Sequence, residues 1–176
     1  MRTATRADIP AIRELILLSV AGLQAETYSA EQRAGAMGTV YGTDEQMIAD
    51  RTYFVIERVA KIIACGGWSW RRTAFGGDGG IAKDDTPLDP AVEPARIRAF
   101  FIHPEFARQG LGTQILEECE QCARAMGFRA MQMTSTLAGI PFYLRHGYAG
   151  FRNIWQCRRS NEGNITMETC RDMNNG

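Results

Sequence analysis

Two glycines one residue apart, Gly110 and Gly112, follow an apolar segment that ends at Ile102 and Pro104. Glycine adopts left-handed backbone conformations without steric cost, so successive N–H groups in such a turn can point into one small volume. The start of the next helix adds its own unpaired N–H groups and partial positive charge. This spacing predicts a site for a phosphate group, and a tight turn without a ligand is the alternative.

Two common phosphate motifs do not fit this turn. A dinucleotide-binding turn would need a third glycine at position 115, which is Ile115, and an acidic residue at the end of the next strand. The residues there are Thr134, Ser135 and Thr136. A P-loop would need Lys followed by Ser or Thr after the glycines, and neither is present. The contacts to a phosphate would therefore come from backbone N–H groups.

The hydrophobic pattern predicts the elements that position this turn. Strands are expected at 97–102 and 129–135, joined by a helix over 113–126 that Gly127 ends. Elsewhere the pattern predicts a strand at 2–4, a helix from Asp8 to about Gly22, a short helix opened by a Ser29–Gln32 capping box, a helical turn at 44–50, a hairpin of 52–57 with 61–70, a short helix at 139–145 and final strands at 148–158 and 165–170. This is an α+β architecture with a mixed sheet.

Composition limits the classes of protein that this chain can represent. Its 176 residues are 45% hydrophobic and 23% charged, as in a single globular domain. Twenty basic residues balance twenty acidic ones, so no basic surface for nucleic acid is indicated. We expect one domain over residues 1–173 with a tail at 174–176. A segment rich in Gly, Asp and Pro at about 71–94 is expected to be a loop insertion.

Membrane, secretion and metal signals are weak. No apolar run approaches the length of a membrane-spanning helix, and the apolar stretch at 15–23 follows acidic residues where a signal peptide has basic ones. Five cysteines and two histidines do not suit a metal site, and Cys119 and Cys122 both fall on the apolar face of a helix. We therefore expect a cytoplasmic protein with reduced thiols, no metal, and neither nucleic acid nor a membrane as a partner.

Two segments resemble the motifs of one family, the GNAT superfamily of acetyl-CoA-dependent N-acyltransferases. HPEFARQGLG, at 103–112, resembles the family's pyrophosphate-binding turn, with Ala107 where the family usually has Gln or Arg. GIPFYLRHGY, at 139–148, resembles the family's helix that carries an aromatic residue and a tyrosine. The order of elements is similar over essentially the whole chain, and residues 97–148 carry the motifs.

The resemblance implies a GNAT-like, mostly antiparallel central sheet flanked by helices, with a central strand–helix–strand unit. It also implies acetyl-CoA as co-substrate and transfer of its acetyl group to a primary amine of a small molecule or peptide by direct attack. A backbone N–H near Phe101 or Ile102 would stabilise the oxyanion that forms during attack. The residues that match the family's cofactor-binding positions are Phe100, Phe101 and Ile102 along the pantetheine, Arg108, Gln109, Gly110, Leu111, Gly112 and Thr113 at the pyrophosphate, and Thr136, where the family often has Asn.

Tyr143 matches the family's tyrosine that donates a proton to the departing thiolate, a role that suits a phenol. The alternative is a tyrosine that packs its ring in the core. No general base is carried over, because Arg96 and Met131 occupy the two positions where the family's acidic base is sometimes found. The unranked candidates are Glu26, Asp44 and Glu57, and His103 is rejected because it lies past the end of its strand.

Several alternatives stay open at this stage. A non-catalytic GNAT-like module that holds acyl-CoA as a regulatory ligand is the alternative to an enzyme. Trp68 and Trp70 share one face of a strand, where they either wall an amine pocket or fill the core. The acidic residues of the insertion either attract a cationic amine or belong to a solvated loop. The sequence also leaves open whether the chain forms a homodimer.

Overall fold

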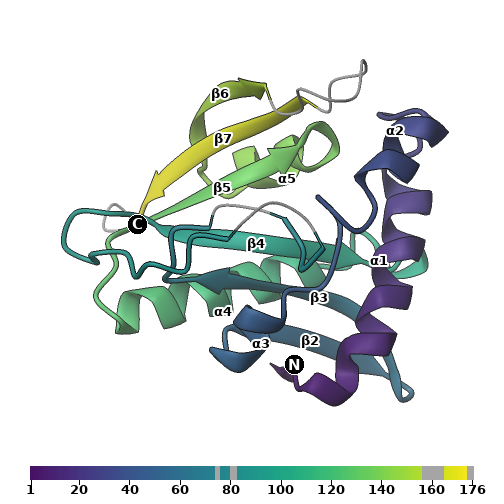
Figure 1. Cartoon of the computed structure of the whole chain (residues 1–176), viewed down its shortest axis with the longest axis horizontal. Helices are drawn as coiled ribbons and strands as arrows, with labels where there is room; N and C mark the ends of the chain where they lie inside the picture. Colours follow the sequence, from purple (N-terminus) through teal and green to yellow (C-terminus); the bar gives the residue numbers. More distant parts are fainter. Residues whose placement is uncertain (74–75, 80–82, 156–164, 174–176) are drawn as a thin grey trace.

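The computed structural model describes residues 1–73, 76–79, 83–155 and 165–173 of the chain. Over these residues a seven-stranded sheet has the order β1-β2-β3-β4-β5-β7-β6 (Figure 1). Its strands are β1 (Arg2–Thr3), β2 (Tyr53–Arg58), β3 (Lys61–Ser69), β4 (Ala95–Ile102), β5 (Ala130–Thr136), β6 (Ala149–Trp155) and β7 (Ile165–Asp172). The helices are α1 (Ile9–Leu23), α2 (Ala30–Ala36), α3 (Glu45–Ala49), α4 (Leu111–Ala125) and α5 (Ile140–Arg145).

The sheet is mixed and mostly antiparallel, as predicted. Strands β4 and β5 form its parallel pair, and α4 is the crossover between them. The other neighbouring strands in the described part of the chain pair in antiparallel fashion. The predicted strand–helix–strand unit is therefore present at the centre of the sheet.

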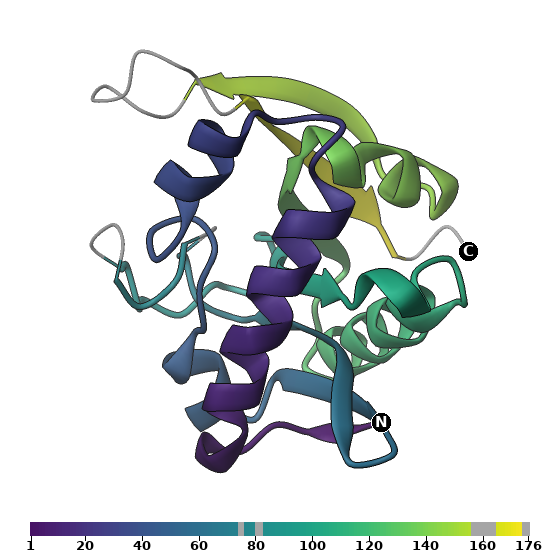
Figure 2. The same ribbon diagram turned by 90° about the vertical axis from the view of Figure 1, so that its right-hand side faces the viewer.

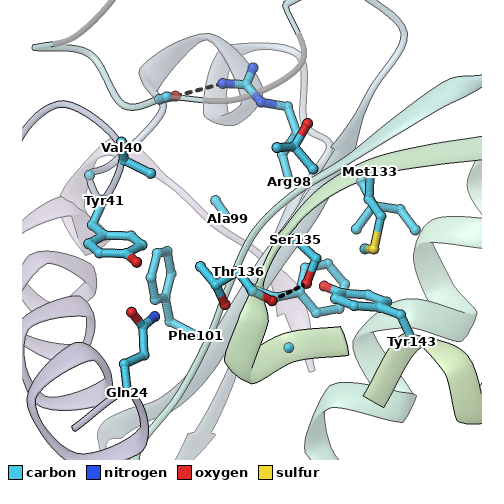
Figure 3. Close-up of a pocket in the computed structure, with 16 residues that line it drawn as sticks. Gln24, Val40, Tyr41, Arg98, Ala99, Phe101, Met133, Ser135, Thr136 and Tyr143 are labelled. Atoms are coloured by element: carbon cyan, nitrogen blue, oxygen red, sulfur yellow. Dashed lines mark hydrogen bonds between the residues drawn. The ribbon is translucent and has the colours of Figure 1, made fainter. Parts of the chain in front are cut away.

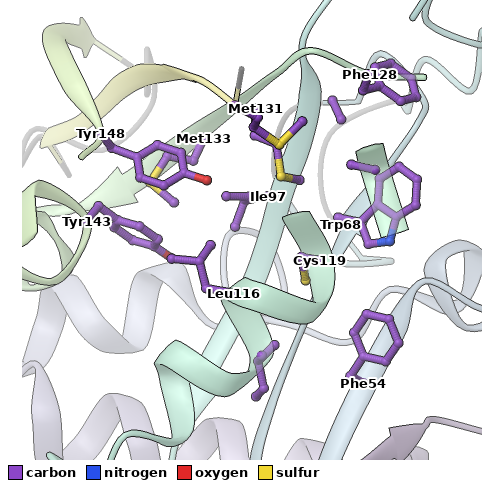
Figure 4. Close-up of a cluster of buried hydrophobic side chains, with 14 of the residues drawn as sticks. Phe54, Trp68, Ile97, Leu116, Cys119, Phe128, Met131, Met133, Tyr143 and Tyr148 are labelled. Atoms are coloured by element: carbon purple, nitrogen blue, oxygen red, sulfur yellow. The ribbon is translucent and has the colours of Figure 1, made fainter. Parts of the chain in front are cut away.

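Helices α1 and α4 cover opposite faces of the sheet (Figure 2). The α1 side buries Ile12, Leu15 and Ile16 against Tyr53 and Val55 of β2. The α4 side buries Ile115 and Leu116 in a second cluster that also contains Phe54 and Ile56 (Figure 4). Neighbouring side chains of β2 therefore enter different cores, as the pleat of a strand requires.

Trp68 and Trp70 belong to the α4-side core. Trp68 is buried and its ring meets the edge of Phe128 with the ring centroids 6.1 Å apart (Figure 4). Trp70 packs against the same cluster, and the Arg71 guanidinium lies over its ring. Neither tryptophan lines the pocket described below, so the core alternative holds for both.

Helix boundaries agree with local capping chemistry. The Ser29 hydroxyl accepts from the Gln32 N–H at 3.2 Å, and the Gln32 side chain accepts from the Ser29 N–H at 2.9 Å, so the predicted capping box is present. Helix α4 begins at Leu111, two residues before the predicted start, because Gly110 is the capping residue with φ of 80°. Gly112 therefore lies within the first turn of α4. Gly127, with φ of 90°, follows the C-terminal end of this helix.

Strand β4 contains a bulge that separates it from β5. Its register against β3 shifts between Arg98 and Phe101, and Ala99 within this interval has φ of 58°. The Tyr53 hydroxyl lies 3.2 Å from the Ala99 carbonyl oxygen and can donate to it. Pairing of β4 with β5 ends at Ile97 and Met133. Beyond this point the two parallel strands diverge.

The insertion is joined to α3 and β4 by buried charges. Asp44, only 1% exposed, lies 2.7 Å from the guanidinium of Arg98 and 2.9 Å from the ammonium of Lys83. Lys83 also contacts Asp78 at 2.8 Å, and Asp78 accepts from the N–H of Glu45. The described part of the insertion is therefore packed against the domain. Among the described residues, no helix has the length and apolar character needed to cross a membrane.

Candidate active site

The gap between β4 and β5 opens into a pocket with a cavity volume of about 130 Å³ (Figure 3). One wall comes from β4 and the other from β5 with the 3₁₀ turn η3 (Leu137–Gly139). The third wall comes from the end of α1 and the segment after α2. The lining residues are Gln24, Val40, Tyr41, Gly42, Gly76, Ile97, Arg98, Ala99, Phe100, Phe101, Met133, Thr134, Ser135, Thr136, Gly139 and Tyr143.

Tyr143 extends from α5 into this pocket. Its ring packs edge-on against Phe100, Phe142 and Tyr148, and the residue is 7% exposed. Burial, with a smaller contribution from Cys119, raises the pKa of the Tyr143 hydroxyl well above its ordinary value. Because no hydrogen bond within the described part of the chain uses this hydroxyl, its proton is available to a group in the pocket. The geometry fits a proton donor.

The three predicted pantetheine residues do not share one environment. Phe100 and Phe101 line the pocket on either side of the bulged strand. Ile102 lies outside the lining, and its N–H donates to the buried Ser19 hydroxyl of α1 at 3.2 Å. Thr136 lines the opposite wall, next to Ser135, whose hydroxyl donates to the Thr136 carbonyl.

The predicted phosphate turn lies beside the helix that carries Tyr143. Arg108 and Gly110 both have positive φ, of 60° and 80°, which reverses the chain directly before α4. The N–H groups of Leu111, Gly112 and Thr113 occupy the first turn of the helix, where no intrahelical acceptor exists. A Cβ built on Gly112 would lie 3.2 Å from the Phe142 ring, so glycine also permits close packing against α5.

Side chains of the turn make further contacts. The Thr113 hydroxyl lies 3.1 Å from Nε2 of His146, whose other ring nitrogen contacts the Phe142 carbonyl. Gln109 accepts from the guanidinium of Arg58 at 3.1 Å. Arg108 and Gln109 are exposed. The turn thus presents exposed backbone N–H groups at the start of α4. None of its residues lines the pocket.

None of the candidate bases lines the pocket. Glu57 pairs with Arg2 at 2.6 Å, Glu26 is exposed, and His103 is buried beside Lys61. Asp44 lies behind the wall, paired with Arg98. Burial favours the neutral form of Arg98 and lowers its pKa, while Asp44 counteracts this.

Arg98 is the one charged side chain among the lining residues that the structure describes. The acidic residues of the insertion do not reach the pocket, and Gly76 is its sole described member there. The Gly76 carbonyl accepts from Arg98 at 2.7 Å. The acidic residues of the insertion therefore place no carboxylate in the pocket.

Sequence reasoning did not find Gln24, Tyr41 or Arg98 as pocket residues. Gln24 follows the last turn of α1, Tyr41 lies in an irregular segment between α2 and α3, and Arg98 precedes the bulge. They converge only in the folded chain. The signal available in the sequence was a polar residue inside an apolar strand, Arg98, and a glutamine at a helix end.

Solved structures resemble this fold over nearly its full length. A GCN5-related N-acetyltransferase from Rhodopseudomonas palustris aligns with a TM-score of 0.64 and 16% identity over 98% of each chain. The PaiA N-acetyltransferase of Thermoplasma acidophilum, solved with coenzyme A, gives 0.58 and 14% over 95% of each chain. The ribosomal-protein-S18-alanine N-acetyltransferase of Escherichia coli gives 0.58 and 15%, with 97% of this chain and 91% of that one covered. At these identities the likeness shows the fold.

The family follows from the sequence itself. No curated protein matches the chain. A family model described as an acetyltransferase (GNAT) domain matches residues 49–149, which include β3, the β4 bulge, the glycine turn and Tyr143. This match spans more than half of the 176 residues. The chain therefore belongs to the GNAT superfamily of acetyltransferases.

Proposed function

We propose that this protein transfers the acetyl group of acetyl-CoA to a primary amine of a small molecule or peptide, by direct attack of the amine on the thioester. The observation that carries the proposal is the pocket in the gap between β4 and β5, with the protonated hydroxyl of Tyr143 inside it. A pocket at such a divergence of strands exposes backbone groups that pairing would otherwise consume.

The residues present fit acetyl-CoA. The thioester supplies the acetyl group and a thiolate leaving group. The unpaired N–H groups at the start of α4 would hold the pyrophosphate, with Arg108, Gln109 and Gly110 at the turn and Leu111, Gly112 and Thr113 in the helix. The backbone of Phe100 and Phe101 would bind the pantetheine, and Thr136 would contact it from the opposite wall. Ile102 fits this set only if its N–H exchanges its Ser19 partner for the pantetheine.

The reaction needs a proton for the departing sulfur and the removal of a proton from the attacking nitrogen. As the amine nitrogen forms its bond to the carbonyl carbon, the carbon–sulfur bond breaks and sulfur takes a proton from Tyr143. The nitrogen loses one proton to water, and Tyr143 regains one from water. No carboxylate or imidazole lines the described pocket, so solvent is the base that this arrangement favours.

Calorimetric titration with acetyl-CoA tests the cofactor site. Wild type is expected to bind, and Gly112→Asp to bind at least about tenfold more weakly, because its carboxylate would face the phosphates. Aspartate at the second position of a helix favours folding, so weaker binding would not reflect loss of α4. Gly112→Ala is the matched control, since it adds the contact with Phe142 without the charge. Equal affinity of Gly112→Asp and wild type would contradict the phosphate assignment.

Thiol release in the presence of amines then separates an enzyme from a binding module. Release that depends on the amine, with the acetylated amine detected by mass spectrometry, is the expected result. Binding of acetyl-CoA without amine-dependent release from a broad panel of primary amines would contradict amine transfer.

A further inference from the structure

One buried polar atom in the pocket has no hydrogen-bond partner among the described residues. Gln24 caps the C-terminal end of α1 and is 8% exposed. Its side chain lines the pocket, and Figure 3 shows the amide directed from the end of α1 toward the rings of Tyr41 and Phe101, with Tyr143 on the other side of the pocket. The carbonyl oxygen Oε1 of Gln24 is buried, and no residue in the described ranges donates a hydrogen bond to it.

The Gln24 amide lies beside two aromatic rings. Tyr41 and Phe101 line the pocket together with Gln24 (Figure 3). Tyr41 is itself buried, with its ring edge-on to Phe101 at 6.2 Å between centroids. The two rings therefore pack beside the Gln24 amide, and Oε1 is left without a hydrogen-bond donor among the described residues.

The backbone around Gln24 is also held. Its carbonyl oxygen accepts from the N–H groups of Thr27 at 3.1 Å and Tyr28 at 3.0 Å. The Tyr28 hydroxyl accepts from the N–H of Leu137 at 2.8 Å, which joins this turn to the wall formed by η3. The backbone of Gln24 is thus fixed at the turn after α1, next to the wall formed by η3. A buried acceptor without a donor is unfavourable, so a ligand that supplies an N–H would complete the site.

The charge of the pocket narrows the class of ligand. Arg98, its charged lining residue among those described, is occupied by Asp44 and by the Gly76 carbonyl. The remaining polar groups that line the pocket are uncharged. Such a pocket suits a substrate amine whose groups near the reactive nitrogen carry no charge. An amide oxygen recognises an N–H donor, and the amine nitrogen becomes a stronger donor as it gains positive charge during attack.

We propose that Oε1 of Gln24 accepts a hydrogen bond from the substrate amine and determines specificity for a primary amine whose neighbouring groups are uncharged. This inference rests on the proposed amine transfer. Gln24 would touch the attacking nitrogen and hold it near the thioester. Gln24 defines the side of the pocket that binds the amine, and Tyr143 defines the side of the leaving group.

Steady-state kinetics on three probes test the proposal: n-butylamine, phenethylamine and trialanine amide with a free amino terminus. Gln24→Met keeps the length of the side chain and removes the acceptor atom, so kcat/KM for the amine is expected to fall by at least about tenfold. The dissociation constant for acetyl-CoA, measured by calorimetry, is expected to stay at the wild-type value. Gln24→Glu keeps an oxygen acceptor and is expected to recover most of the loss. Gln121→Met, on the exposed face of α4, is the matched control.

The outcomes separate this proposal from the function on which it rests. Wild-type kcat/KM for amines in Gln24→Met, or an equal loss in amine turnover and acetyl-CoA affinity, would overturn the role of Gln24 while leaving amine transfer intact. Failure of the wild type to acetylate any of the three probes would contradict both. If Gln24→Met does not fold, Gln24→Ala takes its place as the variant without the acceptor atom. Gln24→Ala is then expected to lower kcat/KM for the amine without changing acetyl-CoA affinity, and wild-type amine kinetics in this variant would refute the proposal.

Discussion

At the scale of single residues, the environment of Tyr143 decides which way it can move a proton. Burial raises the pKa of its hydroxyl above the ordinary tyrosine value. The group therefore stays protonated throughout the neutral and mildly alkaline range. A buried phenol that keeps its proton is a poor base and a suitable acid for a thiolate, which benefits from protonation as it departs.

Tyr143→Phe keeps the ring that packs on Phe100 and Tyr148 and removes the proton donor. We expect kcat to fall by roughly 10²-fold, the lower part of the range for general acid catalysis, while acetyl-CoA affinity is retained. For the wild type, kcat is not expected to fall below about pH 10. The raised pKa of Tyr143 keeps its hydroxyl protonated up to that pH.

The measurement is thiol release from pH 7 to pH 10 with an amine for which chemistry limits turnover. A Tyr143→Phe enzyme within twofold of wild type would return Tyr143 to a packing role. A wild-type fall in kcat centred well below pH 10 would mean that another group supplies the proton.

The sequence could identify Tyr143 and the glycine turn because both lie in local motifs of fixed spacing. It could not identify Gln24 or Tyr41, whose roles depend on contacts between segments with no regular period. Trp68 and Trp70 show a related limit. Their alternation correctly places both on the same side of the sheet, but strand periodicity does not say whether that side meets α4 or the pocket.

At the scale of elements, the bulge in β4 creates the space for the site. Its central residue, Ala99, has φ of 58°, a conformation that ordinarily favours glycine. Nothing in the apolar run at 97–102 signals this conformation, and an uninterrupted strand was expected there. The contacts that maintain the bulge are nonlocal, since Tyr53 comes from β2, with its hydroxyl 3.2 Å from the Ala99 carbonyl.

Ala99→Val is expected to destabilise the protein by about 1–3 kcal/mol, because a β-branched residue is strained at positive φ. It should also weaken acetyl-CoA binding, since the strand would relieve the strain by flattening toward β5. Ala99→Gly is the matched control and is expected to keep both properties, with stability within about 1 kcal/mol of wild type. Urea denaturation and calorimetric titration check the two effects. Wild-type stability and affinity in Ala99→Val would show that the gap does not depend on this bulge.

At the scale of the whole molecule, both cores contain acids that stay neutral because they are buried. On the α1 side, burial raises the pKa of the Cys65 thiol to about 12. Burial also raises the pKa of the Tyr53 hydroxyl. On the α4 side, burial raises the pKa of the Cys119 thiol well above its ordinary value. These thiols fill the interior as small apolar groups, in agreement with the apolar position expected for Cys119. Their protons connect stability to pH.

An unfolded chain releases thiol protons above about pH 8.5, whereas the folded chain keeps those of Cys65 and Cys119. The folded state therefore binds more protons, and raising the pH favours unfolding. Together the two thiols are expected to lower the free energy of unfolding by about 4 kcal/mol between pH 8 and pH 10. Urea denaturation under reducing conditions across this range measures the slope. Cys65→Ala and Cys119→Ala should each reduce this loss by about 2 kcal/mol, whatever either substitution does to stability at pH 7, because only the pH dependence reports the lost proton. A slope unchanged in both variants would mean that other groups cause the alkaline loss.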